Sequence, residues 1–156
     1  MTSSTFGSPA VAEKFWFLGT EMTMLASGAG TGGALGLIEQ VAPAGFAAPP
    51  HIHHAEDEAF YVVSGSIEFH RGDEAINAGP GAFIWLPRDV PHWFAVDAST
   101  PAKLLQFNTP AGLERFFAEM GSPISGSTPP DSPPDMARLF ELAAKYRMEL
   151  LPPPAP

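Results

Sequence analysis

Three histidines and one glutamate have the residue types and the spacing of a metal site. His51 and His53 are two residues apart, so on an extended strand both imidazoles lie on one face. Glu58 follows a polar segment, residues 54–57, which we expect to turn the chain into a neighbouring antiparallel strand. His92 begins another candidate strand after a turn bounded by prolines. Neutral imidazoles with one carboxylate suit one divalent transition ion (iron, nickel, manganese, cobalt, copper or zinc) and bind calcium poorly.

Composition limits the classes of function that remain. A chain of 156 residues is long enough for one domain with one core. It contains no cysteine, which excludes disulfides, thiolate metal sites and cysteine nucleophiles. The formal net charge of −9 disfavours nucleic acid and anionic membrane surfaces as partners. The first residues lack a basic start followed by an apolar run, so we expect no signal sequence and a cytoplasmic protein.

Turn residues divide most of the chain into short candidate strands. These strands recur about every 8–12 residues, a spacing typical of an antiparallel sandwich or barrel and not of alternating β and α units. The glycine-rich segment 28–33 lacks the lysine of a phosphate-binding loop, and we expect it to be a flexible hairpin connection. The sequence therefore predicts a mostly β fold, an antiparallel sandwich or barrel.

Helical patterns appear only near the end of the chain. A first helix is predicted to start at Pro110, with Thr109 as its cap, and to stop at Gly121. A second is predicted over 135–150, after a capping box at 132–135. We expect it to pack on the barrel or on a partner subunit.

These patterns divide the chain into five parts. The predicted parts are a flexible tail (1–12), a barrel with the first helix (13–121), a proline- and serine-rich linker (122–134), the C-terminal helix (135–150) and a proline-rich tail (151–156).

With its candidate ligands placed, the chain resembles a cupin. The first motif of that family is matched in full by Gly45, His51, His53, Glu58 and Gly65. The second motif is matched by Gly81, Pro87 and His92, while Asp89 and Val96 replace a glycine and an asparagine of the family pattern. One pair of motifs implies a single cupin barrel, a double-stranded β-helix or jelly roll.

More loosely, the chain is similar to the single-domain cupins of the quercetin dioxygenase type. This resemblance implies an oxidoreductase that joins O2 to a flavonol-like or other enolisable aromatic substrate. Glu58 would then be both a metal ligand and the catalytic base, accepting a proton from the substrate. Barrels of this kind often pair through their edge strands, so we expect a homodimer.

Four aromatic residues are candidates for the substrate pocket: Phe46, Phe60, Trp85 and Phe94. Phe60 and Phe94 are favoured because they share the inward parity of Glu58 and His92. His54 and His70 are expected to face solvent. Glu39 or Gln106, whichever points inward, would orient a ligand histidine.

Two other functions remain open on the sequence. A metal-dependent isomerase, cyclase or lyase would use the same Lewis acid and carboxylate without oxygen, and anaerobic turnover would identify it. A non-catalytic small-molecule binder would hold its ligand tightly and release no product.

Overall fold

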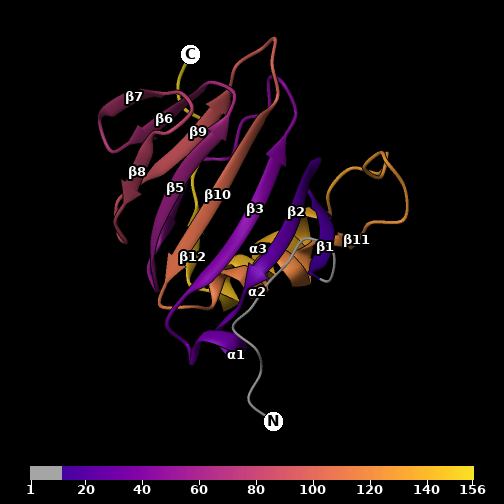
Figure 1. Ribbon diagram of the computed structural model, residues 1–156. Coiled ribbons are helices and arrows are strands. Elements are labelled where there is room, and N and C mark those ends of the chain that lie inside the picture. Colours follow the sequence, from indigo (N-terminus) through magenta and orange to yellow (C-terminus); the bar gives the residue numbers. More distant parts are fainter. Residues whose placement is uncertain (1–11) are drawn as a thin grey trace.

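Two antiparallel β-sheets face each other in the computed structural model, which describes residues 12–156 (Figure 1). The predicted tail, 1–12, lies outside the described residues except for its last position. The larger sheet contains, in spatial order, β11 (Ser122–Pro123), β1 (Glu13–Phe17), β2 (Thr20–Ala26), β3 (Gly36–Ala42), β10 (Ala102–Thr109), β5 (Asp57–Ser64) and β8 (Phe83–Leu86). The smaller sheet contains β12 (Met148–Leu150), β4 (His51–His53), β9 (His92–Val96), β6 (Ile67–Arg71) and β7 (Glu74–Ala78). The predicted mostly β class is confirmed.

The sheets enclose a core because their strands alternate buried and partly exposed residues. In β10, which lies between β3 and β5, every second residue from Ala102 to Asn108 is buried. The rings of Phe60, Phe69 and Phe94, from three different strands, lie with centroids 5.4–5.5 Å apart. Interlocking aromatic rings of this kind hold the two sheets at a fixed separation.

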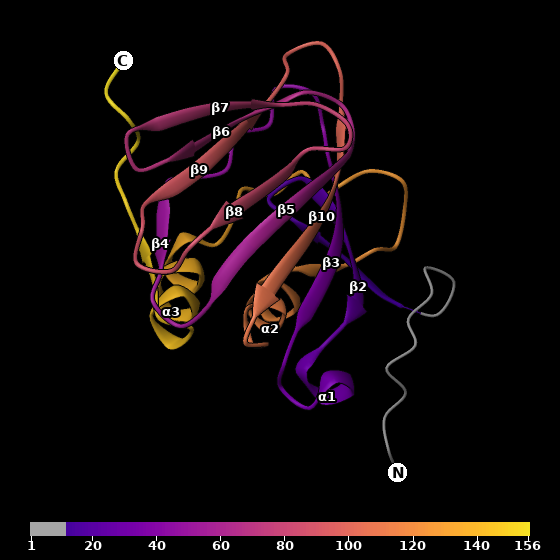
Figure 2. The ribbon, with the colours of Figure 1, turned by 60° about the vertical axis from the view of Figure 1, so that its left-hand side comes forward.

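The helices α2 (Leu113–Met120) and α3 (Met136–Lys145) lie at one end of the barrel (Figure 2). They form a second apolar cluster with β1, β2 and β3, which includes Phe15, Met22, Ile38, Phe116 and Leu139. Of the two surfaces expected for the C-terminal helix, the barrel or a partner subunit, α3 contacts its own barrel. Met136, in the first turn of α3, and Phe140 are exposed.

The predicted start of α2 is wrong, whereas its predicted end at Gly121 is confirmed. The helix begins after Gly112, because the residues before it are engaged elsewhere. The Ala111 amide donates to Gly33 O at 2.9 Å, and the Gly112 amide donates to Glu114 Oε2 at 2.7 Å. These long-range and side-chain bonds replace the first turn that Pro110 would have opened.

The predicted C-terminal helix is also too long. Asp135, not a residue further upstream, is its N-cap and accepts a bond from the Arg138 amide at 3.0 Å. The helix ends at Lys145, Arg147 takes a positive φ of 57°, and β12 then pairs with β4. The last residues of the predicted helix therefore form a strand beside the candidate ligands.

The glycine-rich segment contains a one-turn helix, α1 (Gly28–Thr31), where we expected only a flexible connection. Buried Glu114 holds it in place by accepting bonds from the Gly28 amide at 2.8 Å and from Asn108 Nδ2 at 3.0 Å. Gly36 is needed next to this carboxylate, since a Cβ there would collide with Glu114 Oε2. Within residues 12–156, no helix has the length and apolar character needed to cross a membrane.

Candidate metal centre and its pocket

The candidate ligands come from three strands that belong to two different sheets. His51 and His53 lie on β4, Glu58 lies near the start of β5, and His92 begins β9. We had expected the turn at 54–57 to make β4 and β5 neighbours, and this prediction is wrong. The turn instead carries the chain from the smaller sheet to the larger one. The carboxylate therefore meets the histidines across the barrel. The two histidine strands are themselves paired, with His51 opposite His92.

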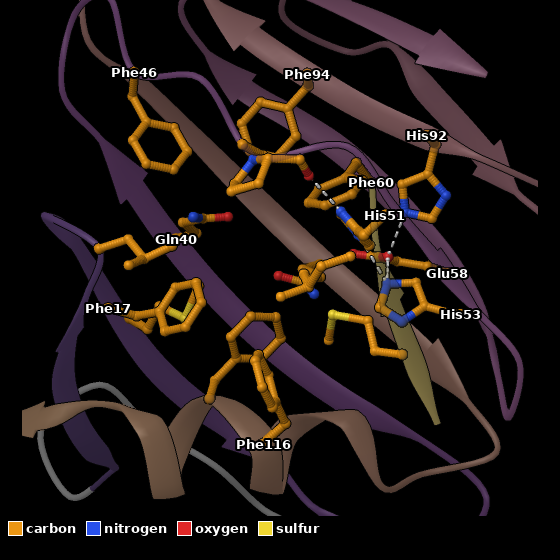
Figure 3. A pocket seen from close by; sticks show the side chains of 18 of the residues that line it. Phe17, Gln40, Phe46, His51, His53, Glu58, Phe60, His92, Phe94 and Phe116 are labelled. Carbon is orange, nitrogen blue, oxygen red and sulfur yellow. Dashed lines mark hydrogen bonds and ion pairs between the residues drawn. The ribbon is translucent and has the colours of Figure 1, made fainter. Parts of the chain in front are cut away.

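The four side chains converge on one point (Figure 3). Glu58 Oε2 lies 2.7 Å from His53 Nε2 and 3.1 Å from His92 Nε2. His51 Nε2 lies 3.1 Å from His53 Nε2. One ligand atom from each residue falls within 4.8 Å of all the others, and His53, Glu58 and His92 are buried. Sequence reasoning thus identified a group of side chains that the fold brings together.

His51 and His92 are each oriented by a contact of Nδ1, the ring nitrogen that faces away from this point. His51 Nδ1 lies 2.7 Å from Pro49 O, and His92 Nδ1 lies 3.3 Å from Val90 O. Because a carbonyl oxygen can only accept, these Nδ1 atoms carry the proton and leave Nε2 with a free lone pair. This arrangement fits a cation, since lone pairs gathered in a buried site repel one another unless a positive charge lies between them.

His53 is oriented by Glu56, a residue that sequence reasoning left in the turn. Glu56 Oε1 lies 3.2 Å from His53 Nδ1, an ion-pair contact without hydrogen-bond geometry, and both residues are buried. In the sequence, this contact is signalled only by the positions of the two residues, i and i+3. The two residues that we had considered for this role do not fill it: Glu39 pairs with Lys103 at 3.7 Å on the outer side, and Gln106 lies in the pocket.

Burial and neighbouring charges strongly shift the pKa values of His51, Glu58 and His53. Burial, together with the neighbouring imidazoles of His92 and His53, lowers the pKa of His51 to about 3. Burial would raise the pKa of Glu58, but the adjacent His53 outweighs it and holds that pKa well below its usual range. Burial likewise opposes charge on His53, yet Glu58 and Glu56 raise its pKa to about 9. A bound cation would take the place of the proton that His53 carries.

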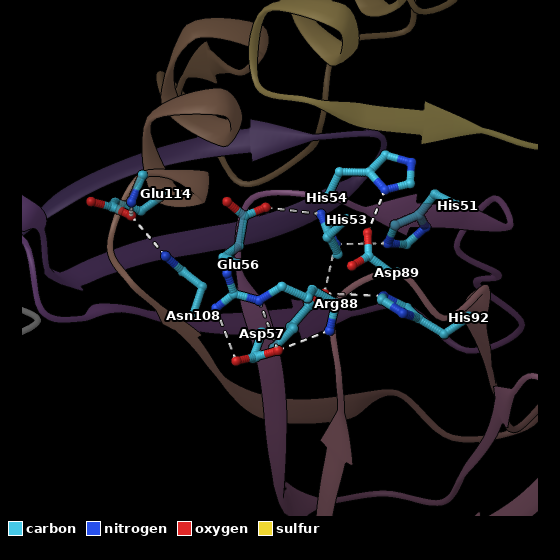
Figure 4. A network of polar contacts seen from close by, with 12 residues as sticks. His51, His53, His54, Glu56, Asp57, Arg88, Asp89, His92, Asn108 and Glu114 are labelled. Atoms are coloured by element: carbon cyan, nitrogen blue, oxygen red, sulfur yellow. Dashed lines mark hydrogen bonds and ion pairs between the residues drawn. The ribbon is translucent and has the colours of Figure 1, made fainter.

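His54 and His70 lie outside this group. His54 contacts Asp89 at 2.6 Å and Glu149 at 3.1 Å, and 37% of its side chain is exposed (Figure 4). His70 stacks on Trp93 with ring centroids 3.9 Å apart. Asp89, which replaces a motif glycine, takes a positive φ of 66°, and its amide donates to His53 O at 2.8 Å. Aspartate therefore preserves the turn next to the candidate ligands.

The candidate centre lies at one end of an apolar pocket. The pocket has an empty volume of about 610 Å³, part of it open to solvent, and its walls include Phe46, Phe60 and Phe94. Trp85 is not among its lining residues. It lies on the outer face of β8 with 42% of its surface exposed, so its assignment to the pocket is wrong. In β8 only Ile84 and Leu86 are buried, so Trp85 between them faces outward.

Several pocket residues were missed because they come from β1, β2, β3, β12 and the two helices, which the sequence did not connect with the candidate ligands. They are Phe17, Met22, Gln40, Phe116, Phe117, Leu139 and Met148. A second, outer cavity shares Phe17, Leu18, Phe46 and Pro49 with the first. Its remaining wall includes prolines of the predicted linker, among them Pro129 and Pro133, and Arg138 of α3. The linker therefore borders the approach to the pocket.

Comparison with known families adds to this geometry. Residues 37–108, which contain all four converging side chains, match the family model described as a cupin domain. Residues 37–108 therefore form a cupin domain. Among solved structures, an RmlC-like cupin from Shewanella frigidimarina NCIMB 400 superposes with a TM-score of 0.63 at 20% identity, covering 74% of this chain and 99% of the other. That likeness concerns the fold.

Two curated relatives of this cupin carry dioxygenase names. Quercetin 2,3-dioxygenase of Bacillus subtilis (strain 168) is 27% identical over 103 residues, 66% of this chain and 30% of that protein. Acireductone dioxygenase of Sulfurihydrogenibium sp. (strain YO3AOP1) is 33% identical over 72 residues, 43% of this chain and 40% of that protein. The cupin thus spans well under half the length of either relative.

Proposed function

We propose that this cupin is a metal-dependent dioxygenase acting on a flavonol-like or other enolisable aromatic substrate. The observation that carries the proposal is the position of three imidazoles and a carboxylate at one end of an aromatic-lined pocket. The dioxygenase names of the two curated relatives support it. A divalent transition ion held by His51, His53, Glu58 and His92 would supply Lewis acidity and electron exchange with O2.

The pocket phenylalanines would bind the substrate, and Glu58 would accept its proton. Phe46, Phe60 and Phe94 offer flat apolar surfaces that bind an aromatic ring and exclude water. Both contacts of Glu58 with histidines go to Oε2, so Oε1 is the oxygen available to accept the proton of a substrate hydroxyl. Excluding water strengthens every charge interaction that stabilises the resulting oxyanion.

The test is oxygen uptake by protein reconstituted separately with each candidate ion. With 3-hydroxyflavone as the substrate, we expect uptake with at least one redox-active ion and none with zinc. The variant Glu58→Gln should lose at least 100-fold in uptake per bound ion, the order of magnitude for removal of a general base. Glu68→Gln, a change to a carboxylate on the outside of the barrel, is the matched control and should keep full uptake.

Other results would replace the proposal with one of the alternatives. Uptake unchanged in Glu58→Gln, at equal metal content, would remove the base role from Glu58. Turnover of an enolisable substrate without O2 would assign the protein to the isomerases, cyclases or lyases. Tight binding with no product by mass spectrometry would assign it to the non-catalytic binders.

A further inference from the structure

Gln106 is a buried amide whose nitrogen has no hydrogen-bond partner within the described chain. It lies on the inner face of β10, opposite Ile38 of β3 and Phe60 of β5, with 1% of its surface exposed. Its Nε2 is among the few buried side-chain atoms left without a partner in residues 12–156, and the residue lines the pocket. An unpaired buried donor costs free energy, so a leucine at this position would give a more stable barrel.

The two neighbouring amide side chains that point inward, Gln40 of β3 and Asn108 of β10, both donate hydrogen bonds within the protein. Gln40 Nε2 donates to Thr20 Oγ1 at 3.2 Å, and Thr20 Oγ1 donates in turn to Phe17 O at 2.7 Å. Asn108 Nδ2 donates to Glu114 Oε2 at 3.0 Å. Figure 3 shows Gln40 at the pocket wall. Gln106 thus differs from both neighbours in having its donor free.

The register of the sheet places Gln106 close to Glu58. Asn108 lies opposite Glu58, and Gln106 lies opposite Phe60, two residues further along β5. Diagonal neighbours on one face of a sheet have Cα atoms about 7–8 Å apart, within reach of long side chains. Gln106 and Glu58 both line the pocket, so one small molecule can touch both. Phe60 beside them adds an apolar surface.

We propose that Gln106 Nε2 donates a hydrogen bond to a second oxygen of the substrate, next to the oxygen that gives its proton to Glu58. The inference rests on the proposed function and narrows its substrate class. It selects molecules in which a hydroxyl and a carbonyl stand on adjacent carbons of a flat ring system. The hydroxyl faces Glu58 and the carbonyl accepts from Gln106. An analogue without the carbonyl leaves the buried donor unpaired and binds more weakly.

The test measures binding without turnover. Zinc-loaded protein under nitrogen is titrated with 3-hydroxyflavone, whose fluorescence reports the Kd. Gln106→Leu should weaken binding roughly 3- to 10-fold, the loss of one hydrogen bond. Its melting temperature without ligand should equal or exceed that of the wild type, because no bond within the protein is lost. Leu105→Ala, on the same strand but facing outward, is the matched control and should leave the Kd unchanged.

A second experiment, on the wild-type protein, tests the role of Gln106 even if the variant does not fold. The side-chain NH2 signal of Gln106 in a nitrogen-15 NMR spectrum should shift when 3-hydroxyflavone is added to the zinc-loaded protein. An unshifted signal, or an equal Kd for Gln106→Leu, overturns the role of Gln106 and leaves the proposed function standing. Failure of the wild type to bind 3-hydroxyflavone overturns the flavonol-like substrate class itself, and with it this inference.

Discussion

Glu56 and Glu58 lie on opposite sides of the same imidazole. Glu56 Oε1 is 3.2 Å from His53 Nδ1, and Glu58 Oε2 is 2.7 Å from His53 Nε2. The two carboxylates therefore hold the ring of His53 in one orientation, with Nε2 directed at the point where His51 and His92 also converge. A partner behind a ligand histidine both aims the ring and increases its basicity.

Glu56→Gln should therefore weaken metal binding without removing a ligand. Loss of such a supporting carboxylate typically lowers affinity about 10- to 100-fold. Competition with a coloured chelator for zinc would measure this change. Asp57→Asn, in the same turn, alters only a surface pair with Arg88 at 3.1 Å and should bind zinc as the wild type does. Equal affinities in Glu56→Gln and the wild type would contradict the role of Glu56.

Glu114 makes stability depend on pH through a group remote from the candidate centre. Burial opposes its charge, but hydrogen bonds from Asn108, Gly112 and Gly28 outweigh burial and lower its pKa below the ordinary 4.5. A group with a lowered folded pKa stabilises the fold fully above its unfolded pKa, and loses that contribution as pH falls through the folded value.

Glu114→Gln should accordingly lower the free energy of unfolding by about 1–3 kcal/mol at pH 7, since buried donors lose their acceptor. The difference from the wild type should shrink as pH falls below 4.5. Urea unfolding of the metal-free proteins over a pH series measures both effects. A difference that stays constant with pH would show that the carboxylate charge contributes nothing.

The strand β12 supports the histidines from the far end of the chain. Met148 pairs with His53 and Leu150 with His51, and the Leu151 amide donates to Pro50 O at 2.9 Å. Deleting residues 148–156 should lower the melting temperature and weaken zinc binding, because β4 loses one of its two neighbours. Deleting only 152–156 removes the proline-rich tail and should change neither quantity. Normal zinc affinity in the longer deletion would contradict this support.

Phe60 lies inside the barrel and Trp85 outside it, so truncation to alanine should lower the unfolding free energy much more at Phe60 than at Trp85. Phe60 is 3% exposed and packs among Phe69 and Phe94, so Phe60→Ala should lose about 3–5 kcal/mol of unfolding free energy. Trp85→Ala should cost much less and should leave oxygen uptake unchanged, because its ring lies outside the barrel. Urea unfolding compares the two variants. A loss of oxygen uptake in Trp85→Ala would contradict the placement of Trp85 outside the pocket.

Local rules of the chain determined the candidate ligands and the class of fold. Alternation along a strand places His51 and His53 on one face whatever the strand packs against. The regular spacing of turn residues likewise predicts short antiparallel strands without knowledge of their partners. The set His51, His53, Glu58 and His92, together with an antiparallel sandwich or barrel, could therefore be predicted from local order, and the resemblance to cupins selected the barrel.

Only the tertiary structure decided what depends on partners far away in the sequence. Alternation shows that Trp85 and Leu86 face opposite ways, but not which of them faces inward. The apolar residues near Leu150 fit a helix or a strand, and pairing with β4, nearly 100 residues earlier, made them a strand. The crossing between sheets at 54–57, the contact of Glu56 with His53 and the unpaired nitrogen of Gln106 are likewise properties of packing. Burial and pairing arise between segments, and no periodicity within one segment encodes them.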